Sequence, residues 1–220
     1  SGCPSKIAIP PALDAVAPET SRSFEVGGKL SLFDGALDTT IALFNLEKRN
    51  VLAADLANPG FSLPIGAARS RGVEIDIAGR LPGDIDLLPS YAYLDAEARA
   101  NVADPNFSLQ IRTGDPLINV PDHSFNMQLS RAWDVIGTEL RLGAGVQYVG
   151  ERLGETATTF TLPDYTLVRL FANWAITDQV ELFTTITNLF DETYYTNSFA
   201  RLWVQPGTPR TATIGARVRF

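Results

Sequence analysis

Cysteine and histidine are nearly absent from this sequence, which contains one cysteine, Cys3, and one histidine, His123, among 220 residues. A single cysteine excludes a disulfide within the chain, and the scarcity of both residue types leaves no spacing typical of a metal site. Asp122, His123 and Ser124 have the residue types of a catalytic triad, but adjacent residues on a strand point to opposite faces and cannot form the relay. We therefore predict that the chain is not an enzyme and holds no metal or cofactor.

Long apolar runs and clusters of basic residues are also missing. Nothing approaches the roughly 20 consecutive apolar residues of a membrane-spanning helix, so a membrane protein with this sequence must cross with strands. The chain has 18 basic and 25 acidic residues and a net charge of −7, which argues against nucleic acid as a partner. The first 20 residues resemble no signal peptide, so we expect either that one has been removed or that the chain starts inside a longer protein.

Apolar and polar residues alternate along most of the chain, a pattern that predicts an all-β fold. In residues 210–220, for example, every second residue is apolar up to Phe220, while the other face is small, polar or cationic. After a loop over residues 1–20, the alternation predicts nine strands at about 22–33, 36–48, 71–80, 85–96, 122–132, 138–150, 165–176, 180–190 and 210–220.

The predicted connections alternate between short links of about 2–6 residues and long ones of about 14–25, whereas hairpin loops usually have about two to five. Outer-membrane barrels have this pattern because their periplasmic turns are short and their exterior loops are long. Predicted strands of about 10–13 residues also suit a tilted crossing of the hydrocarbon, which takes roughly 9–11. The sequence therefore predicts an antiparallel transmembrane β-barrel. Because bacterial single-chain barrels have even strand numbers, we expect the nine strands to be the C-terminal part of a larger barrel.

The alternation also predicts which side chains face the lumen and which meet the lipid boundary. Arginine or lysine facing lipid at the bilayer midplane costs about 2–4 kcal/mol, so charged strand residues are expected to face inward. These residues are Glu25, Lys29, Glu74, Asp76, Arg80, Glu139, Arg141, Arg217 and Arg219, with Arg169 and Asn173. Aromatic residues near strand ends suit the lipid–water boundary, with core packing as the alternative. They are Tyr91, Tyr93, Tyr148, Tyr165, Trp174, Tyr194 and Tyr195.

Nine segments, in order from about Pro18 to Phe220, resemble the C-terminal portion of TonB-dependent siderophore receptors of the ferrichrome-receptor type. The segments are PETSRSFEVGGK, IALFNLEKRNVL, SRGVEIDIAGRL, SYAYLDA, NVPDHS, GAGVQYVGER, FTLPDYTLVR, TNLFDETYY and PGTPRTATIGARVRF. The resemblance implies a 22-stranded barrel, closed by an N-terminal plug, that binds a ferric chelate outside and imports it with energy from TonB. This sequence lacks a plug, a TonB-contacting segment and the first dozen or so strands, so residues 1–220 are expected to be a barrel fragment.

The resemblance also suggests site residues. Counted back from the C-terminal phenylalanine, Phe199 stands where ferrichrome-type receptors carry an aromatic near the bound siderophore. In the same loop, Arg201 could pair with an anionic chelate and Trp203 could pack on its organic shell. Arg152 and Phe160 are further candidates for ligand contact, and an ordinary surface loop is the alternative for all five.

Phe220 resembles the terminal signal that directs outer-membrane barrels to the assembly machinery; the alternative is an edge strand that simply ends on an apolar residue.

The sequence as a whole predicts an outer-membrane receptor for a ferric siderophore in a Gram-negative bacterium. Its expected partners are the siderophore, TonB through the missing plug, the barrel-assembly machinery, and the lipid and lipopolysaccharide of the outer membrane. The alternatives are a TonB-dependent receptor for another nutrient, a porin, or a soluble all-β binding module.

Overall fold

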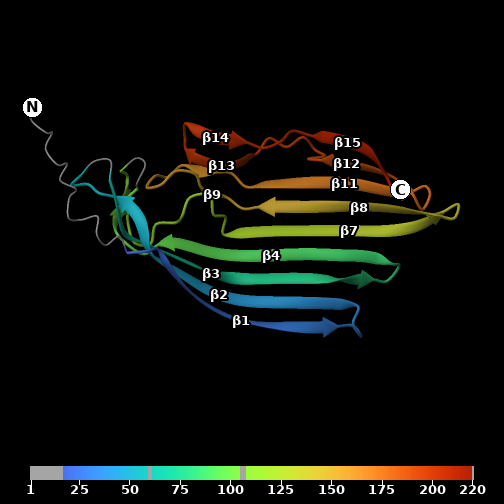
Figure 1. The fold of residues 1–220 in the computed structure, drawn as a ribbon, viewed down its shortest axis with the longest axis horizontal. Helices are drawn as coiled ribbons and strands as arrows, with labels where there is room; N and C mark the ends of the chain where they lie inside the picture. Colours follow the sequence, from blue (N-terminus) through green and yellow to red (C-terminus); the bar gives the residue numbers. More distant parts are fainter. Residues whose placement is uncertain (1–16, 59–60, 105–107, 220) are drawn as a thin grey trace, which may run out of the picture.

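A computed structural model describes residues 17–58, 61–104 and 108–219, and nine strands form its main sheet (Figure 1). Every strand of this sheet pairs antiparallel with the next one along the chain. The nine are β1 (Thr20–Leu32), β2 (Leu37–Ala54), β3 (Ser62–Leu81), β4 (Ile85–Ala98), β7 (His123–Val135), β8 (Thr138–Val149), β11 (Tyr165–Ala175), β12 (Val180–Thr187) and β15 (Thr211–Val218). The predicted all-β, antiparallel fold and its nine strands are confirmed.

Six short strands lie in the three long connections, at the end of the sheet opposite the short turns (Figure 1). They pair as β5 (Val102–Ala103) with β6 (Gln110–Ile111), β9 (Arg152–Leu153) with β10 (Thr161–Leu162), and β13 (Tyr195–Ala200) with β14 (Trp203–Pro206). These small hairpins were not predicted. No helix in the part of the chain that the structure describes is long and apolar enough to cross a membrane.

The predicted long connection between strands two and three is wrong. Strands β2 and β3 remain paired as far as Ala54 and Ser62, so only residues 55–61 connect them. The register shifts beside Asn50, whose φ is 59°, and such a bulge changes which face each following side chain takes. The apolar alternation therefore loses its phase there, and the sequence pattern ends before the strand does.

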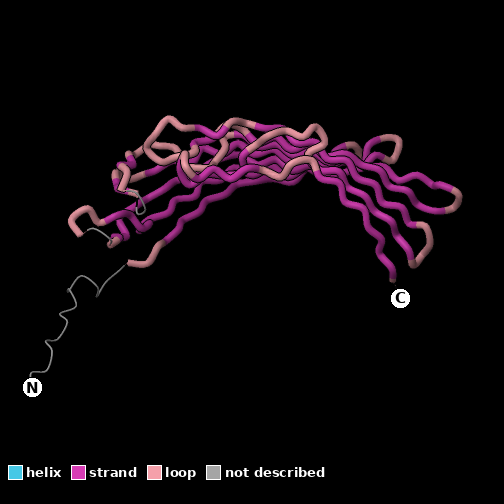
Figure 2. Tube along the Cα trace, turned by 90° about the horizontal axis from the view of Figure 1, so that it is seen from above, coloured by secondary structure: helices cyan, strands magenta, loops and turns pink. Residues whose placement is uncertain are grey.

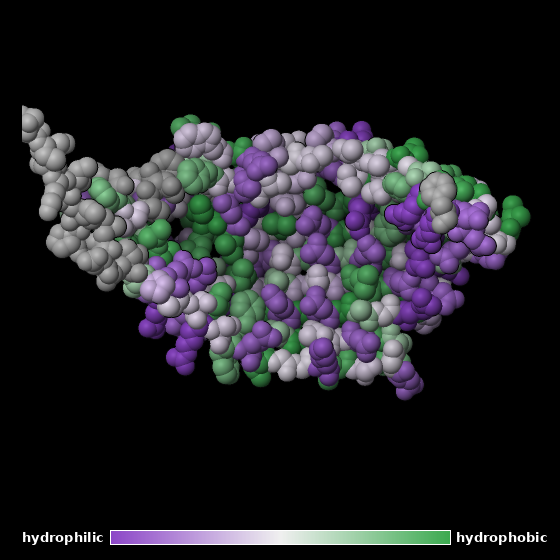
Figure 3. Space-filling model, in the orientation of Figure 1, coloured by the Kyte–Doolittle hydropathy of each residue, from purple (hydrophilic) through white to green (hydrophobic). Residues whose placement is uncertain are grey.

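Cross-strand register places the predicted inward charges that lie within the strands, all but Arg219, on one face, here called the polar face. Glu181 stands opposite Arg217, and their side chains form an ion pair of 2.9 Å. Asp86 joins Arg80 at 2.9 Å and Arg141 at 2.7 Å. A hollow of about 780 Å³ lies on this face near the short turns. The sheet is strongly curved (Figure 2), and hydrophilic residues gather over the short-turn end (Figure 3).

The opposite face, here called the apolar face, leaves large hydrophobic side chains uncovered. Phe24 is 70% exposed and Ile214 is 83% exposed. Among the described residues the buried apolar side chains are few and mostly small, namely Ala53, Ala96, Ala98, Ala103, Leu162 and Ala200. A single curved sheet encloses no core of its own, so its apolar face requires an apolar environment.

Some of the aromatic residues predicted for the lipid–water boundary share the apolar face, and the boundary itself stays a prediction. Tyr91, Tyr93, Tyr148 and Trp174 share the apolar face according to the register. Tyr165 and Tyr194 do not belong with them, because Tyr165 lies on the polar face and its ring centroid is 4.6 Å from that of Tyr194. The first 16 residues of the predicted N-terminal loop and the predicted assembly signal, Phe220, lie outside the described residues.

Glycines on the polar face leave room for aromatic rings from neighbouring strands. Gly143 pairs with Phe171, and a Cβ on this glycine would lie 2.1 Å from the ring. Gly215 pairs with Phe183 in the same way, at 2.3 Å. We expect each ring to cover its glycine and to fix the local register of the strands.

The substitution Gly143→Ala should lower the free energy of unfolding by about 1–3 kcal/mol, because the added methyl group must displace the Phe171 ring. The measurement is urea unfolding of the full-length protein in detergent. Gly145→Ala is the matched control, since its Cβ would lie 3.5 Å from the nearest atom, an ordinary contact. In the Gly143→Ala/Phe171→Ala double variant, the two changes in the free energy of unfolding should not simply add, because the residues are in contact. Simple additivity, as found for distant pairs, would contradict the proposed coupling.

Candidate functional site in the long loops

The three long connections, residues 99–122, 150–164 and 188–210, are joined to one another by side chains. The side chain of Asn119, in the first connection, donates through Nδ2 to the Ser198 carbonyl at 2.7 Å, and its Oδ1 accepts from the Ser198 backbone amide at 2.8 Å. The backbone amide of Asn119 donates to the Leu153 carbonyl at 2.8 Å. Its φ of 62° is one that asparagine tolerates better than most residues. One residue thus connects the first loop to both of the others.

A second junction joins the other two connections. Ser198 is 3% exposed, and its hydroxyl donates to the Gly154 carbonyl. The Gly154 amide donates to the Phe160 carbonyl at 2.8 Å, which closes the β9–β10 turn. Because these groups are buried or paired, the β13–β14 hairpin has a fixed position over the second connection.

Arg152 is the main cation of this junction and is 4% exposed. Its guanidinium donates to the carbonyls of Tyr195, Thr196 and Gly150, and it lies 5.5 Å above the Tyr165 ring centroid. No ion pair to Arg152 occurs within the described ranges. Burial lowers the pKa of the Arg152 guanidinium, and the charge of Tyr165 opposes this shift. Carbonyl oxygens therefore hold this cation, and the predicted contact with a ligand stays a prediction.

The other four predicted site residues come together at the β13–β14 hairpin. The Arg201 guanidinium lies 5.9 Å from the Phe160 ring centroid, and the rings of Phe199 and Trp203 are 6.1 Å apart. Phe199 is 48% exposed and Trp203 is 60% exposed. These residues, here called the aromatic–arginine cluster, present two rings and a cation to the solvent at the long-loop end of the sheet.

Glu155 contacts the aromatic–arginine cluster and was not predicted as a site residue. Its carboxylate accepts from Arg201 Nε at 2.9 Å, and 46 residues separate the two in the chain. The Arg201 guanidinium holds the pKa of Glu155 below its usual value. Asn119 was also missed as a site residue, although it begins one of the segments that carry the family resemblance.

The cluster is suited to binding rather than to reaction. Exposed aromatic rings pack on organic surfaces, and a guanidinium pairs with carboxylates or other anions. Arg201 uses Nε for Glu155, while its terminal nitrogens donate to no group in the described part of the chain. Within the same ranges, no three histidine, cysteine or acidic side chains are grouped as metal ligands. An anionic organic ligand fits this chemistry.

The chain is similar to a known family of proteins. A family described as TonB dependent receptor-like, beta-barrel matches residues 7–189. The metal-pseudopaline receptor CntO of Pseudomonas aeruginosa strain UCBPP-PA14 is 39% identical over 211 residues, covering 94% of this chain and 28% of that protein. The ferrichrome outer membrane transporter/phage receptor of Escherichia coli K12 is 30% identical, covering 93% and 27%.

The crystal structure of the siderophore receptor PiuA from Acinetobacter baumannii has a TM-score of 0.76 to this chain at 25% identity. The match covers 90% of this chain and 28% of that one. The chain thus spans between a quarter and a third of the length of these relatives.

The substitution Asn119→Gly should loosen the β13–β14 hairpin, because it removes both side-chain hydrogen bonds to the Ser198 backbone while keeping the backbone conformation. Loss of these two part-buried hydrogen bonds corresponds to about 1–3 kcal/mol, or roughly tenfold or more faster amide exchange at Ser198. Hydrogen exchange followed by mass spectrometry measures this rate. Asn197→Ala, an exposed position in the same hairpin, is the control, and unchanged exchange at Ser198 would rule out the tether.

Proposed function

Because the chain belongs to the TonB-dependent receptor-like β-barrel family, we propose that it is part of a receptor that imports a ferric siderophore with energy supplied through TonB. The barrel is an outer-membrane structure of Gram-negative bacteria, and its apolar face meets the lipid. The observation that carries the proposal is the exposed aromatic–arginine cluster of Phe160, Phe199, Arg201 and Trp203 at the long-loop end. In such barrels this end faces the cell exterior, where a chelate arrives.

The ligand chemistry follows from the cluster. The rings of Phe199 and Trp203 would pack on the organic shell of the chelate, and the free terminal nitrogens of Arg201 would pair with its negative charge. Iron arrives already wrapped by its chelator, so the protein need not supply metal ligands. The named relatives support this class, since they are receptors or transporters for metal-pseudopaline, ferrichrome and siderophores.

The proposed transport requires parts beyond the described sheet. Strands β1 and β15 each pair with one neighbour in the structure. In lipid, every unpaired backbone group costs several kcal/mol, so we propose that further strands pair with both edges to close a barrel of 22 strands. The plug and its TonB contact would belong to the remaining length of the receptor, and recognition of Phe220 by the assembly machinery stays a prediction.

A chelate of a metal other than iron is the second candidate ligand. The relative with 39% identity is a metal-pseudopaline receptor, whereas the ferrichrome transporter is 30% identical. The aromatic–arginine cluster contacts the organic part of a chelate, so its residues do not decide between metals.

The full-length receptor, produced in a Gram-negative host that lacks its own siderophore receptors, should restore growth on a ferric siderophore under iron starvation. Growth should disappear when TonB is deleted, because import through a closed barrel needs that energy. Parallel uptake of labelled iron, zinc and nickel chelates identifies the metal. Growth that persists without TonB would indicate a porin and would overturn the proposal.

The substitutions Phe199→Ala and Arg201→Ala should each raise the half-saturating chelate concentration for uptake by roughly three- to tenfold, because each removes a central ligand contact. Glu155→Gln should lower it for an anionic chelate, since Arg201 would lose its competing carboxylate. Matched controls are Phe190→Ala, which is also exposed, and Arg219→Ala, at the short-turn end. Equal effects of site and control substitutions would show that the assigned residues do not bind the ligand.

A further inference from the structure

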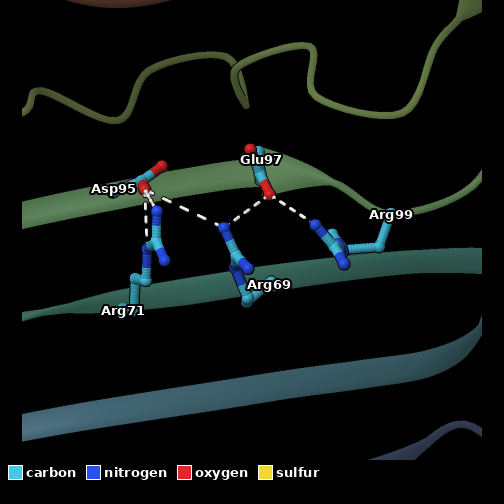
Figure 4. A network of polar contacts seen from close by, with 5 residues as sticks. All are labelled: Arg69, Arg71, Asp95, Glu97 and Arg99. Carbon is cyan, nitrogen blue, oxygen red and sulfur yellow. Dashed lines mark hydrogen bonds and ion pairs between the residues drawn. The ribbon is translucent and has the colours of Figure 1, made fainter.

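Five arginines gather at the long-loop end of strands β1–β4 on the side of the sheet that carries the apolar face. Strand register places Arg71 opposite Asp95 and Arg69 opposite Glu97, and Figure 4 shows these pairs with Arg99 beside them. Arg69 pairs with Glu97 at 2.6 Å, and Arg71 pairs with Asp95 at 2.8 Å. The set, here called the arginine patch, is completed by two arginines of the neighbouring strands and one further acid. Its members are Arg22, Arg49, Arg69, Arg71 and Arg99 with Glu47, Asp95 and Glu97.

The patch continues the apolar face beyond its aromatic boundary. Toward the long loops, Arg71 comes next after Ile75 and Val73 on one face of β3, and Asp95 comes next after Tyr91 and Tyr93 on the same face of β4. Tyr91 and Tyr93 contact His123 through a 2.8 Å hydrogen bond and a 5.2 Å ring contact, respectively. The order toward the long loops is thus apolar, aromatic and then arginine-rich. Strand β2 has 18 residues and β3 has 20, whereas roughly 9–11 cross the hydrocarbon. Both strands therefore extend beyond the hydrocarbon, and the arginine patch lies on this extension.

The patch is more positive than the chain around it. Five arginines share three carboxylates there, which leaves two excess positive charges in a chain whose net charge is −7. Arg22 forms no ion pair with any described residue, although it stands opposite Glu47. Arg69 Nε is buried and has no hydrogen-bond acceptor among the described residues. The side chains of Arg71 and Arg99 are 54% and 45% exposed, so an outside anion can reach them.

We propose that the arginine patch binds the phosphate groups of lipopolysaccharide in the exterior leaflet of the outer membrane. A guanidinium matches a phosphate with two parallel N–H donors, and in the free protein the cross-strand carboxylates of Asp95 and Glu97 compete with a phosphate for these donors. Charges that face outward at the headgroup level attract lipid phosphates and are not desolvated by hydrocarbon. The assignment rests on the proposed outer-membrane receptor, because only there does this side of the sheet contact lipopolysaccharide.

The test uses the full-length receptor in detergent and measures its affinity for purified lipopolysaccharide, dephosphorylated lipopolysaccharide and phosphatidylglycerol. Removing the phosphates should weaken binding at least about tenfold, and phosphatidylglycerol should bind more weakly than lipopolysaccharide. Arg22→Gln/Arg71→Gln should weaken binding of lipopolysaccharide by about tenfold, whereas Asp95→Asn/Glu97→Gln should strengthen it. Arg217→Gln, which removes a paired arginine from the polar face, is the control and should have no effect.

Opposite changes in the two double variants separate lipid binding from damage to the fold, since misfolding weakens binding in both. The proposal fails if both variants bind more weakly, if Arg217→Gln has the same effect as Arg22→Gln/Arg71→Gln, or if phosphatidylglycerol binds more tightly than lipopolysaccharide. Chelate uptake by the Arg22→Gln/Arg71→Gln variant should equal that of the unaltered receptor. A receptor that binds lipopolysaccharide as expected but imports no chelate would refute the proposed transport and leave the arginine patch in place.

Discussion

The antiparallel hydrogen-bond ladder of nine strands is the constraint on which the rest of the structure depends. Side chains alternate between faces, so a slip of one strand by one residue would move the charges of that strand from the polar face to the apolar one. Here the register joins Glu181 to Arg217 and Phe171 to Gly143, and both pairs would be lost in a slipped sheet. The two faces, the hollow near the short turns and the arginine patch all follow from this single pairing pattern.

The long loops obey a different rule, because they lie beyond the ladder and need side chains to hold them. Arg152 and Asn119 perform this task with hydrogen bonds to the backbone of the β13–β14 hairpin. The residues proposed to contact the ligand, Phe199, Arg201 and Trp203, stand on that hairpin and remain largely exposed. Position and recognition are therefore supplied by different residues: Arg152 is buried and Asn119 is partly buried, whereas the second group is open to the solvent.

Most of the sheet could be predicted from the sequence, because period-two alternation is a local signal wherever one face is apolar. The prediction failed at residues 49–70, where a bulge beside Asn50 changes the phase and the strands extend past the apolar region. Contacts between the loops could not be predicted from the sequence, for a different reason. Arg201 and Glu155 are 46 residues apart, and Asn119 and Ser198 are 79 apart, so no local pattern relates them. Tyr165 was misplaced because an aromatic residue at a strand end can face either way.

The tethers of the β13–β14 hairpin have a consequence for how such a receptor can change its ligand. Arg152 holds the carbonyls of Tyr195 and Thr196, and Asn119 holds the amide and carbonyl of Ser198. Every amino acid carries a carbonyl, and all but proline carry an amide hydrogen. Apart from Ser198, whose buried hydroxyl bonds the Gly154 carbonyl, side chains on the hairpin can therefore be replaced during evolution while its anchorage is retained, so a new specificity need not require a new scaffold.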